Sequence, residues 1–599
     1  MKLQNKPRSL RQLAAIAALI GVALTGTASA LTVKNNKDNN PSDPLIVDSL
    51  RYAIANTPAG GTVDFSSSLN GKTIALKGGQ LVVNKQLTIK GLGASKLTVS
   101  GNNVSRVFFV SGSFALPTVI SDVTITKGNA VGTDLSGSGL DSDGGGILNT
   151  GFLSLVRVAV TGNKALVGNG GGIFNSGASS VSDSTISYNS ASSSAPGNGD
   201  GNGGGIYDVQ DMTIARCAIF NNTAQADGGG IQELGSATLI NTTVASNTAG
   251  GAGGGINDGF GATIKTYNVT VAGNAAATGG GLANVLPVGQ SWELRNTIVA
   301  NNSAASGPDI FLGSVGAPIS QGNNLIGKKD GSIPGPIATY AGSDFLGTIG
   351  SPLNPKLGPL QNNGGPTVTM ALLPGSPAID NGSNANLLGT MTSDQRGFMV
   401  RIINGGISLT VDIGAYEYST ARSLKNEAIA DLQPCLTSLD CRTRSRAASA
   451  ILCIQRSLTP ALWLSDTTLG TCGELVFDKE EEAAYQLQKI ISYSPDMACV
   501  QDALDAVQDL VLADEQLARA AIDAAVAAGG NAAKIASAKS EMVIAQSYLA
   551  KQDYKGAIDH YEHAWELAQQ AQGIKEDEDA CKAIKRLWEH DGDGDDDCN

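Results

Sequence analysis

The sequence predicts a mainly β protein: a right-handed parallel β-helix, which is a solenoid, with an N-terminal capping helix and a C-terminal all-α domain that contains cysteines. Three observations predict this fold class. Between Gly144 and Asn302 the motif of three glycines and an aliphatic residue occurs six times, at intervals of 25 to 33 residues. Each copy ends in asparagine with Val or Ile three residues earlier. After Tyr418 glycine almost vanishes and helical spacing begins.

A fixed period in the twenties without helical spacing is typical of a solenoid of short strands. The closing asparagines are Asn163, Asn189, Asn222, Asn247, Asn274 and Asn302. The aliphatic residues at offset −3 are Val160, Ile186, Ile219, Val244, Val271 and Val299. At offset −5 stand Val158, Ser184, Cys217, Thr242, Val269 and Thr297. Because side chains alternate along a strand, offsets −5 and −3 are expected to point inward.

The alternate offsets are expected to point outward. Offset −6 holds Arg157, Asp183, Arg216, Asn241, Asn268 and Asn296. Offset −4 holds Ala159, Thr185, Ala218, Thr243, Thr270 and Ile298. The glycines allow tight turns where a Cβ would clash. The closing asparagines either stack as an amide ladder or occupy left-handed bends, and the right hand follows from the rule for parallel crossovers.

Composition limits the class of partner and the compartment. A net charge of −13 and a pI near 4.8 argue against nucleic acid as a partner. Residues 1–30 have the basic start, the short apolar run and the Ala28-Ser29-Ala30 cleavage site of a signal peptide. No later apolar stretch is long enough to span a membrane, so the mature chain is expected to lack a membrane-spanning segment.

The chain divides into four predicted regions after the signal peptide. Residues 31–60 form the N-terminal cap, in which Asp48 caps a short helix over Ser49–Asn56. This helix covers the open end of the solenoid, whose strand edges need protection. Residues 61–345 form the β-helix and 346–420 a C-terminal cap. Residues 421–599 form the α-helical, cysteine-rich domain with an acidic tail.

Several motifs resemble those of exported bacterial proteins. The segment from Asp48 to Ile54 resembles the N-terminal cap of secreted β-helix proteins with a SLREAI motif. The glycine and I/V-x-x-N repeats are similar to the GGAI and FxxN repeats of polymorphic outer membrane proteins. Four stretches resemble the choice-of-anchor Q segment that ends such proteins: Leu360–Thr367, Pro374–Asp380, Asp394–Gly397 and Val411–Glu417. The resemblance implies the fold and export, and it says little about activity.

The C-terminal region carries seven of the eight cysteines: Cys435, Cys441, Cys453, Cys472, Cys499, Cys581 and Cys598. The seven cysteines include no Cys-x-x-Cys pair, which argues against a zinc site. An oxidising compartment favours disulfides instead, of which up to three are expected. Helical spacing extends from Leu504 to Val526 and stops at Gly529-Gly530. The following hairpin, Ser537–Gln570, resembles a single tetratricopeptide repeat, which would pack against the preceding helices.

The sequence identifies no catalytic residue and no cofactor, and calcium is the metal that its acidic residues favour. Asp591, Asp593 and Asp595 have the first spacings of a calcium loop, but Asp596 stands where the loop needs glycine, so a solvated acidic tail is the favoured explanation. A calcium or turn role is open for Asp141, Asp143, Asp200, Asp208 and Asp258. His560 and His563, beside Asp559 and Glu562, form either a solvated helix face or a metal site.

Two enzyme classes were compared with a binding role. A polygalacturonase-like hydrolase is disfavoured because all three histidines lie in the C-terminal domain. A pectate-lyase-like enzyme needs a basic Arg or Lys beside calcium-binding carboxylates. Arg157, Asp183 and Arg216 supply the residue types for it, or form a surface charge ladder. Cys217 is expected to be a small buried core residue rather than a reactive thiol.

The sequence therefore favours an exported protein, secreted or associated with the cell surface or outer membrane, with an adhesion, binding or structural role. Cell-surface glycans or proteins are the expected partners. A polysaccharide lyase on the same fold is the alternative, and the preference is for a protein without enzymatic activity.

Overall fold

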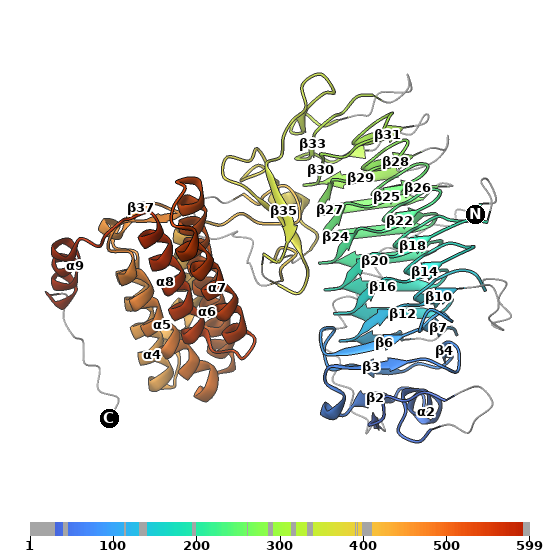
Figure 1. The fold of residues 1–599 in the computed structure, drawn as a ribbon, viewed down its shortest axis with the longest axis horizontal. Helices are drawn as coiled ribbons and strands as arrows, with labels where there is room; N and C mark the ends of the chain where they lie inside the picture. The colour runs from blue at the N-terminus through green and yellow to red at the C-terminus, as the bar shows by residue number, and fades with distance from the viewer. Residues whose placement is uncertain are drawn as a thin grey trace, which may run out of the picture.

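The computed structural model has a β-solenoid-like region followed by a helical domain, with a two-stranded segment between them (Figure 1). It describes residues 30–39, 46–112, 116–130, 141–194, 199–259, 262–284, 291–312, 319–331, 340–363, 365–389, 391, 393–397 and 410–590. The predicted signal peptide and the acidic tail with Asp591, Asp593, Asp595 and Cys598 lie outside these residues, apart from Ala30.

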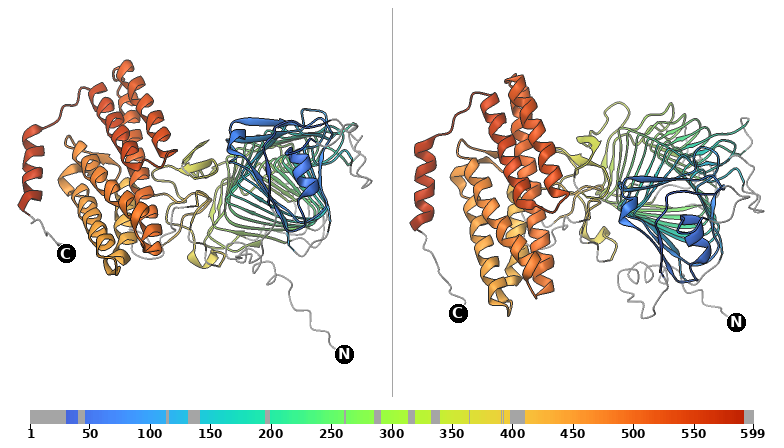
Figure 2. Two further views of the ribbon diagram at one scale, coloured as in Figure 1. Left: turned by 90° about the horizontal axis from the view of Figure 1, so that it is seen from below. Right: turned by 60° about the horizontal axis from the view of Figure 1, so that its bottom comes forward.

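The N-terminal end of the solenoid is covered by helix α2 (Leu50–Asn56), as Figure 2 shows. Leu50, Ala53 and Ile54 are its buried face, as the sequence predicts. The prediction of Asp48 as the cap is wrong: Ser49 accepts the hydrogen bond from the Tyr52 backbone N–H, and Asp48 adopts a left-handed φ of 61°. The chain turns at Asp48, so the side chain that can reach the first helical turn is the next one.

Strands of successive coils pair in parallel and form three sheets among the described residues. The largest contains β1 Ala30–Val33, β2 Thr62–Phe65, β3 Lys72–Ala75, β5 Thr88–Lys90, β6 Leu97–Ser100, β8 Thr118–Ser121, β9 Thr124–Thr126, β12 Phe152–Val156, β13 Ala159–Thr161, β16 Ala178–Ser182, β17 Thr185–Ser187, β20 Asp211–Ala215, β21 Ala218–Phe220, β24 Ser236–Ala245, β27 Thr263–Ala272, β29 Ser291–Arg295, β30 Ile298–Ala300, β32 Ile319–Ser320, β33 Leu325–Ile326 and β34 Phe345–Leu346.

The second sheet contains β4 Leu81–Val83, β7 Phe108–Val110, β11 Ile147–Asn149, β15 Ile173–Asn175, β19 Ile206–Asp208, β23 Ile231–Glu233, β26 Ile256–Asp258, β28 Leu282–Asn284 and β31 Ile310–Leu312. In the second sheet, each strand from β11 to β28 begins at the aliphatic residue of a glycine motif. The third sheet contains the short strands β10 Asn129–Ala130, β14 Lys164–Ala165, β18 Ser190–Ala191, β22 Thr223–Ala224 and β25 Thr248–Ala249. Each repeat of the sequence is therefore one coil.

The predicted inward rows are buried. Offset −3 stacks in register from Val160 through Ile186 and Ile219 to Val244, and each of these side chains is at most 1% exposed. Every residue at offset −5 is buried as well, including the polar Ser184, Cys217 and Thr242. The apolar interior therefore follows the period that the repeats predict.

The predicted outward row is partly wrong. Residues at offset −6 have positive φ, between 46° and 53°, so each one is a left-handed bend. Asparagine and aspartate tolerate this region better than most residues. In the last three repeats, offset −6 (Asn241, Asn268, Asn296) is also buried, and so is offset −4. The segment that follows the solenoid covers this face of the sheet.

This covering segment runs along the sheet flank and includes β35 (Leu357–Gln361) and β36 (Thr369–Leu372), which pair antiparallel, and the 3₁₀ turn η2 (Asn384–Asn386). Thr243 Oγ1 donates to Gln395 Oε1 at 2.6 Å, and the Ala415 backbone N–H donates to Thr270 Oγ1 at 3.0 Å. Ile298 shares a buried apolar cluster with Ile413 and other residues of this segment. It therefore packs across the side of the later coils.

The closing asparagines form an amide ladder. Asn163 Nδ2 donates to Asn189 Oδ1 at 3.0 Å, and the same bond continues through Asn222, Asn247 and Asn274 to Asn302, at 2.9–3.0 Å. The left-handed bend lies one residue earlier, at positions such as Gly162, Tyr188 and Asn221. Of the two alternatives, the ladder is therefore the role of the asparagine itself, and it satisfies amides that are buried.

The second glycine of each motif has no room for a side chain. A Cβ on Gly145 would lie 2.3 Å from the Lys164 carbonyl oxygen and 2.4 Å from that of Gly171 in the next coil. The first glycine, such as Gly144 with φ 64°, occupies the left-handed region. The motif therefore serves the tight corner that the sequence predicts.

The helical domain is one bundle with a common apolar core. Its elements are α3 Ala421–Leu432, η3 Gln433–Thr437, α4 Cys441–Ser457, η4 Pro460–Leu462, the short hairpin β37 Trp463–Ser465 and β38 Thr468–Leu469, α5 Glu474–Tyr493, α6 Met497–Ala527, α7 Ala532–Leu549, α8 Tyr554–Ala571 and α9 Glu578–His590. The predicted hairpin corresponds to α7 and α8, which pack against each other, and α8 also packs on α5 and α6.

Two cysteine pairs of this domain lie at disulfide distance. Cys435 pairs with Cys499, and Cys472 with Cys581, each with 5.4 Å between the Cα atoms. Cys441 and Cys453 have free thiols, so these two disulfide candidates are not paired among the described residues. The first pair links η3 to the start of α6, and the second attaches α9 to the segment before α5.

We expect reduction to lower the stability of the helical domain and to leave the solenoid transition unchanged. The two disulfides close loops of 64 and 109 residues. Each stabilises the folded domain by about 2–4 kcal/mol, because it restricts the unfolded chain. Mass spectrometry of non-reduced digests checks the pairing. Full alkylation of Cys435, Cys472, Cys499 and Cys581 without reductant would refute it.

Candidate functional site

Three buried carboxylic acids form a column inside the solenoid. Asp208, Glu233 and Asp258 are the third residues of β19, β23 and β26, and they stand in register on consecutive coils. Each is 0% exposed. They share a strand face with Ile206, Ile231 and Ile256 of the apolar core, because residues two apart point the same way.

This column continues an amide ladder. Asn149 Nδ2 donates to Asn175 Oδ1, and Asn175 Nδ2 donates to Asp208 Oδ1, both at 2.6 Å. At the other end, Trp292 Nε1 donates to Asp258 Oδ2. Asp258 Oδ1 has no hydrogen-bond partner among the described residues, whereas the carboxyl groups of Asp208 and Glu233 can hydrogen-bond to each other when one of them carries a proton. A buried ionised carboxylate without a cation is costly.

Burial therefore raises the pKa of all three acids. The pKa of Asp208 rises to about 7 through burial, although the Asn175 amide opposes the shift, and that of Asp258 also rises to about 7 through burial. The pKa of Glu233 is raised well above its usual value by burial and then by repulsion from Asp208. Near neutral pH the column holds protons.

We expect Asp208→Asn to stabilise the solenoid above pH 7. The folded-state pKa is raised, so the stabilising protonated form is present at low pH and is lost as pH rises from about 4 through about 7. Each pKa unit corresponds to about 1.4 kcal/mol, so the gain at pH 8 is on the order of a few kcal/mol. Thermal unfolding at pH 5 and 8 measures it.

Asp523→Asn, at an exposed aspartate of α6, is the control and should leave the solenoid melting temperature unchanged at both pH values. Equal pH dependence in Asp208→Asn and the parent chain would show that Asp208 does not hold a proton in the folded state.

The other aspartates considered for turns or calcium have separate positions. Asp143 begins a second ladder, in which its Oδ1 accepts the Asn169 backbone N–H at 2.6 Å, and burial raises its pKa to about 6. Asp141 lies in a turn and Asp200 is half-buried. Asp208 and Asp258 end strands rather than lie in surface turns. The five therefore do not form one calcium site in this structure.

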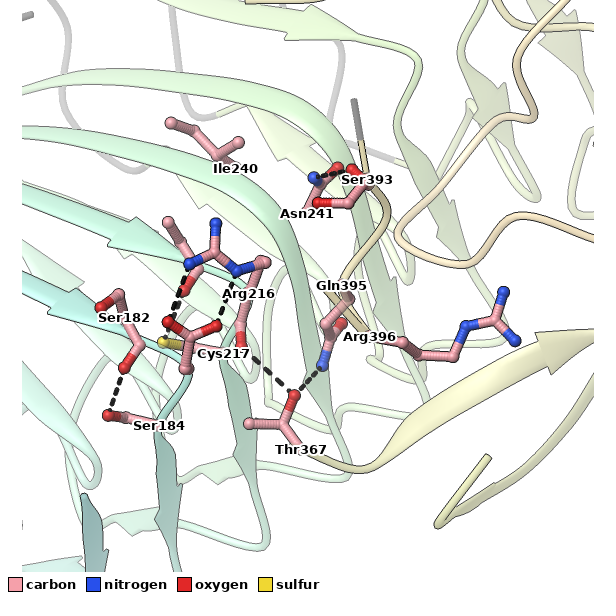
Figure 3. A network of polar contacts seen from close by, with 12 residues as sticks. Ser182, Ser184, Arg216, Cys217, Ile240, Asn241, Thr367, Ser393, Gln395 and Arg396 are labelled. Carbon is pink, nitrogen blue, oxygen red and sulfur yellow. Dashed lines mark hydrogen bonds and ion pairs between the residues drawn. The ribbon is translucent and has the colours of Figure 1, made fainter. Parts of the chain in front are cut away.

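The outward charges form ion pairs across coils. Arg216, which is labelled in Figure 3, donates to both Asp183 oxygens at 2.6 and 2.8 Å. Arg157 donates to both Asp122 oxygens at 2.7 and 2.8 Å. The hydrogen bond to the partner aspartate raises the pKa of each guanidinium. Neither arginine therefore has the depressed pKa that a catalytic base requires.

Cys217 lies in the interior, as expected. It is 0% exposed, and burial raises the pKa of its thiol to about 12. Its Sγ atom lies 3.2 Å from the Ala215 carbonyl oxygen. A thiol that stays protonated and inaccessible is not a nucleophile.

An open polar cavity of about 560 Å³ lies between α4, α5 and α8. Its lining includes Cys453, Arg456, Glu482, Tyr485 and Lys555. Burial, followed by the nearby Glu482 carboxylate, raises the pKa of the Cys453 thiol to about 12. The thiol is thus unreactive near neutral pH, and the cavity provides no activated nucleophile at this position.

Two histidines and an aspartate of α8 lie close enough together to hold a metal ion. Asp559, His560 and His563 each offer a ligand atom within 4.8 Å of the others. Among the described residues one other group meets this criterion, Cys435, Cys499 and Asp502, but its cysteines are paired with each other. Sequence spacing alone did not reveal that His560 also contacts Glu541 of α7, at 2.7 Å.

Comparisons with known protein families, curated proteins and solved structures found no match for this chain.

Proposed function

We propose that the chain is an exported protein, secreted or held at the cell surface, whose solenoid is a rigid scaffold for adhesion or binding. The observation that carries this proposal is that the repeated polar residues take part in hydrogen bonds and ion pairs that hold the coils together, or are buried inside them. The asparagines bond from coil to coil, the arginines pair with aspartates, and the acid column lies in the interior. What the repeats present outward is an extended surface rather than a catalytic group.

Export is supported by two cysteine pairs at disulfide distance, which suit an oxidising compartment. In the part of the chain that the structure describes, no helix combines the length and apolar character needed to cross a bilayer. We also propose that the solenoid is right-handed and that its repeats and C-terminal cap are related to polymorphic outer membrane repeats and the choice-of-anchor Q segment. N-terminal sequencing of exported protein should give Leu31 as the first residue.

The surface candidate for ligand contact is an aromatic pair on adjacent coils. The side chain of Tyr188 is 61% exposed, and its ring meets Phe220 edge-on with 5.7 Å between centroids. An exposed aromatic residue on a rigid support is the kind of group that carries binding energy at interfaces. Cell-surface glycans or proteins are the proposed ligands.

A binding and cleavage screen with glycans and cell-surface proteins tests this role. Tyr188→Asn is the informative variant, because Asn221 occupies the equivalent left-handed position with the same φ of 53°. The variant should fold normally and lose binding, while Tyr493→Asn, at a tyrosine 70% exposed on α5, should retain it. No binding by the parent chain would refute the proposal, and cleavage would favour the lyase alternative.

A further inference from the structure

A cluster of nitrogen and oxygen ligands lies on one face of α8. Asp559 and His563 are four residues apart and His560 and His563 three apart, which places the three on neighbouring positions of the helix surface. A ligand atom of each lies within 4.8 Å of the others. Their side chains are 46%, 19% and 52% exposed for Asp559, His560 and His563, so an ion from solvent can reach them.

Both imidazole rings are held by acceptors at Nδ1. His563 Nδ1 lies 2.8 Å from the Asp559 backbone carbonyl oxygen, which can only accept a hydrogen bond. His560 Nδ1 lies 2.7 Å from Glu541 Oε2 on α7, and the Tyr548 ring packs 4.8 Å from the His560 ring centroid. In the neutral rings these contacts place the proton on Nδ1 and leave the Nε2 lone pair available. Asp559 Oδ2 lies 3.6 Å from His563 Nδ1, so this exposed side chain rotates toward Nε2 when it joins the site.

We propose that Asp559, His560 and His563 bind a divalent transition-metal ion of the zinc class. Neutral imidazole nitrogens with one carboxylate are ligands that zinc accepts, and the remaining coordination positions would be filled by water or a bound partner. Glu541 orients His560 as the outer carboxylate of a carboxylate–histidine–metal arrangement. The bundle supports the site because α7 and α8 pack along their length.

The chain contains only three histidines, so ¹⁵N-histidine spectra of the full-length protein test the site directly. Without metal, two of the three rings should show the Nδ1–H tautomer. Zinc chloride should then shift the Nε2 signals of these two rings, and the His560→Gln and His563→Gln variants assign them. The signal of His590 should stay in place.

Calorimetric titration with zinc chloride gives the affinities. His560→Gln and His563→Gln should each weaken zinc binding at least 10-fold, and Glu541→Gln about 10-fold through loss of ring orientation. His590→Gln is the matched control and should bind like the parent chain. Circular dichroism verifies that each variant folds.

The proposal is overturned if the double variant His560→Gln/His563→Gln binds zinc as tightly as the parent chain. It is also overturned if zinc binds without moving any Nε2 signal, because binding would then belong to carboxylates such as Asp591, Asp593 and Asp595. Absence of zinc binding to the full-length protein in the calorimetric titration would overturn it equally.

Discussion

Val244→Asp is expected to abolish the cooperative unfolding transition of the solenoid. Val244 is 0% exposed and stacks in register between Ile219 and Val271. Aspartate there would place a carboxylate without a cation in the apolar column, which costs more than the lost packing. Val244→Ala, which leaves a cavity alone, should cost about 1–4 kcal/mol. Thermal unfolding followed by circular dichroism measures both changes.

Val82→Asp provides the matched control. Val82 is also on a solenoid strand, β4, but its side chain is 45% exposed. Its substitution should leave the melting temperature near that of the parent chain. If Val244→Asp melts like the parent chain, offset −3 does not point inward and the assigned register is wrong.

Lys425→Met is expected to destabilise the helical domain by about 3–5 kcal/mol, the usual cost of removing one partner from a buried ion pair. Lys425 is 0% exposed and contacts both Glu480 on α5 and Asp514 on α6, the latter at 3.1 Å. Burial and then repulsion from Glu480 already raise the pKa of Asp514 well above its usual value. Without the ammonium group, two buried carboxylates would face each other.

Lys425→Met combined with Glu480→Leu and Asp514→Leu should recover most of the lost stability, because an apolar replacement of a complete buried ion cluster is often neutral or stabilising. The solenoid transition should be unchanged in both variants. A single variant as stable as the parent chain would show that the three groups do not interact in the folded domain.

Periodicity predicted the solenoid core and little of its polar interior. The −3 and −5 rows could be predicted because stacked coils repeat the same environment. The left-handed bend at offset −6 could not, since arginine at Arg157 and Arg216 is not typical of positive φ. The burial of Asn241, Asn268 and Asn296 arises from contacts with a segment 87 to 152 residues later, which local spacing does not encode.

The first half of the helical domain was also difficult to predict. The stretch that forms α4 has few long apolar runs, and its buried side chains include small residues such as Ala447 and Ala450. Lys425 and Glu480 lie in the core, and sequence alone does not predict this because lysine and glutamate are rarely fully buried. Among the site residues, the position of Glu541 beside His560 depends on the packing of α7 on α8 and has no sequence signal.

Distances between spin labels on successive coils test the central claim, the in-register stacking of one coil per repeat, most directly. Asp64 stands in register with Lys90, Ser121, Val156, Ser182 and Ala215 in turn. Labels are introduced at Asp64 with Ser182, or at Asp64 with Ala215, after Cys441, Cys453 and Cys598 are replaced by serine. With about 4.8 Å per coil, the backbone separations are about 19 and 24 Å. An increase of one coil spacing between the two pairs is the predicted result, and a second distance equal to or shorter than the first would contradict the stacking.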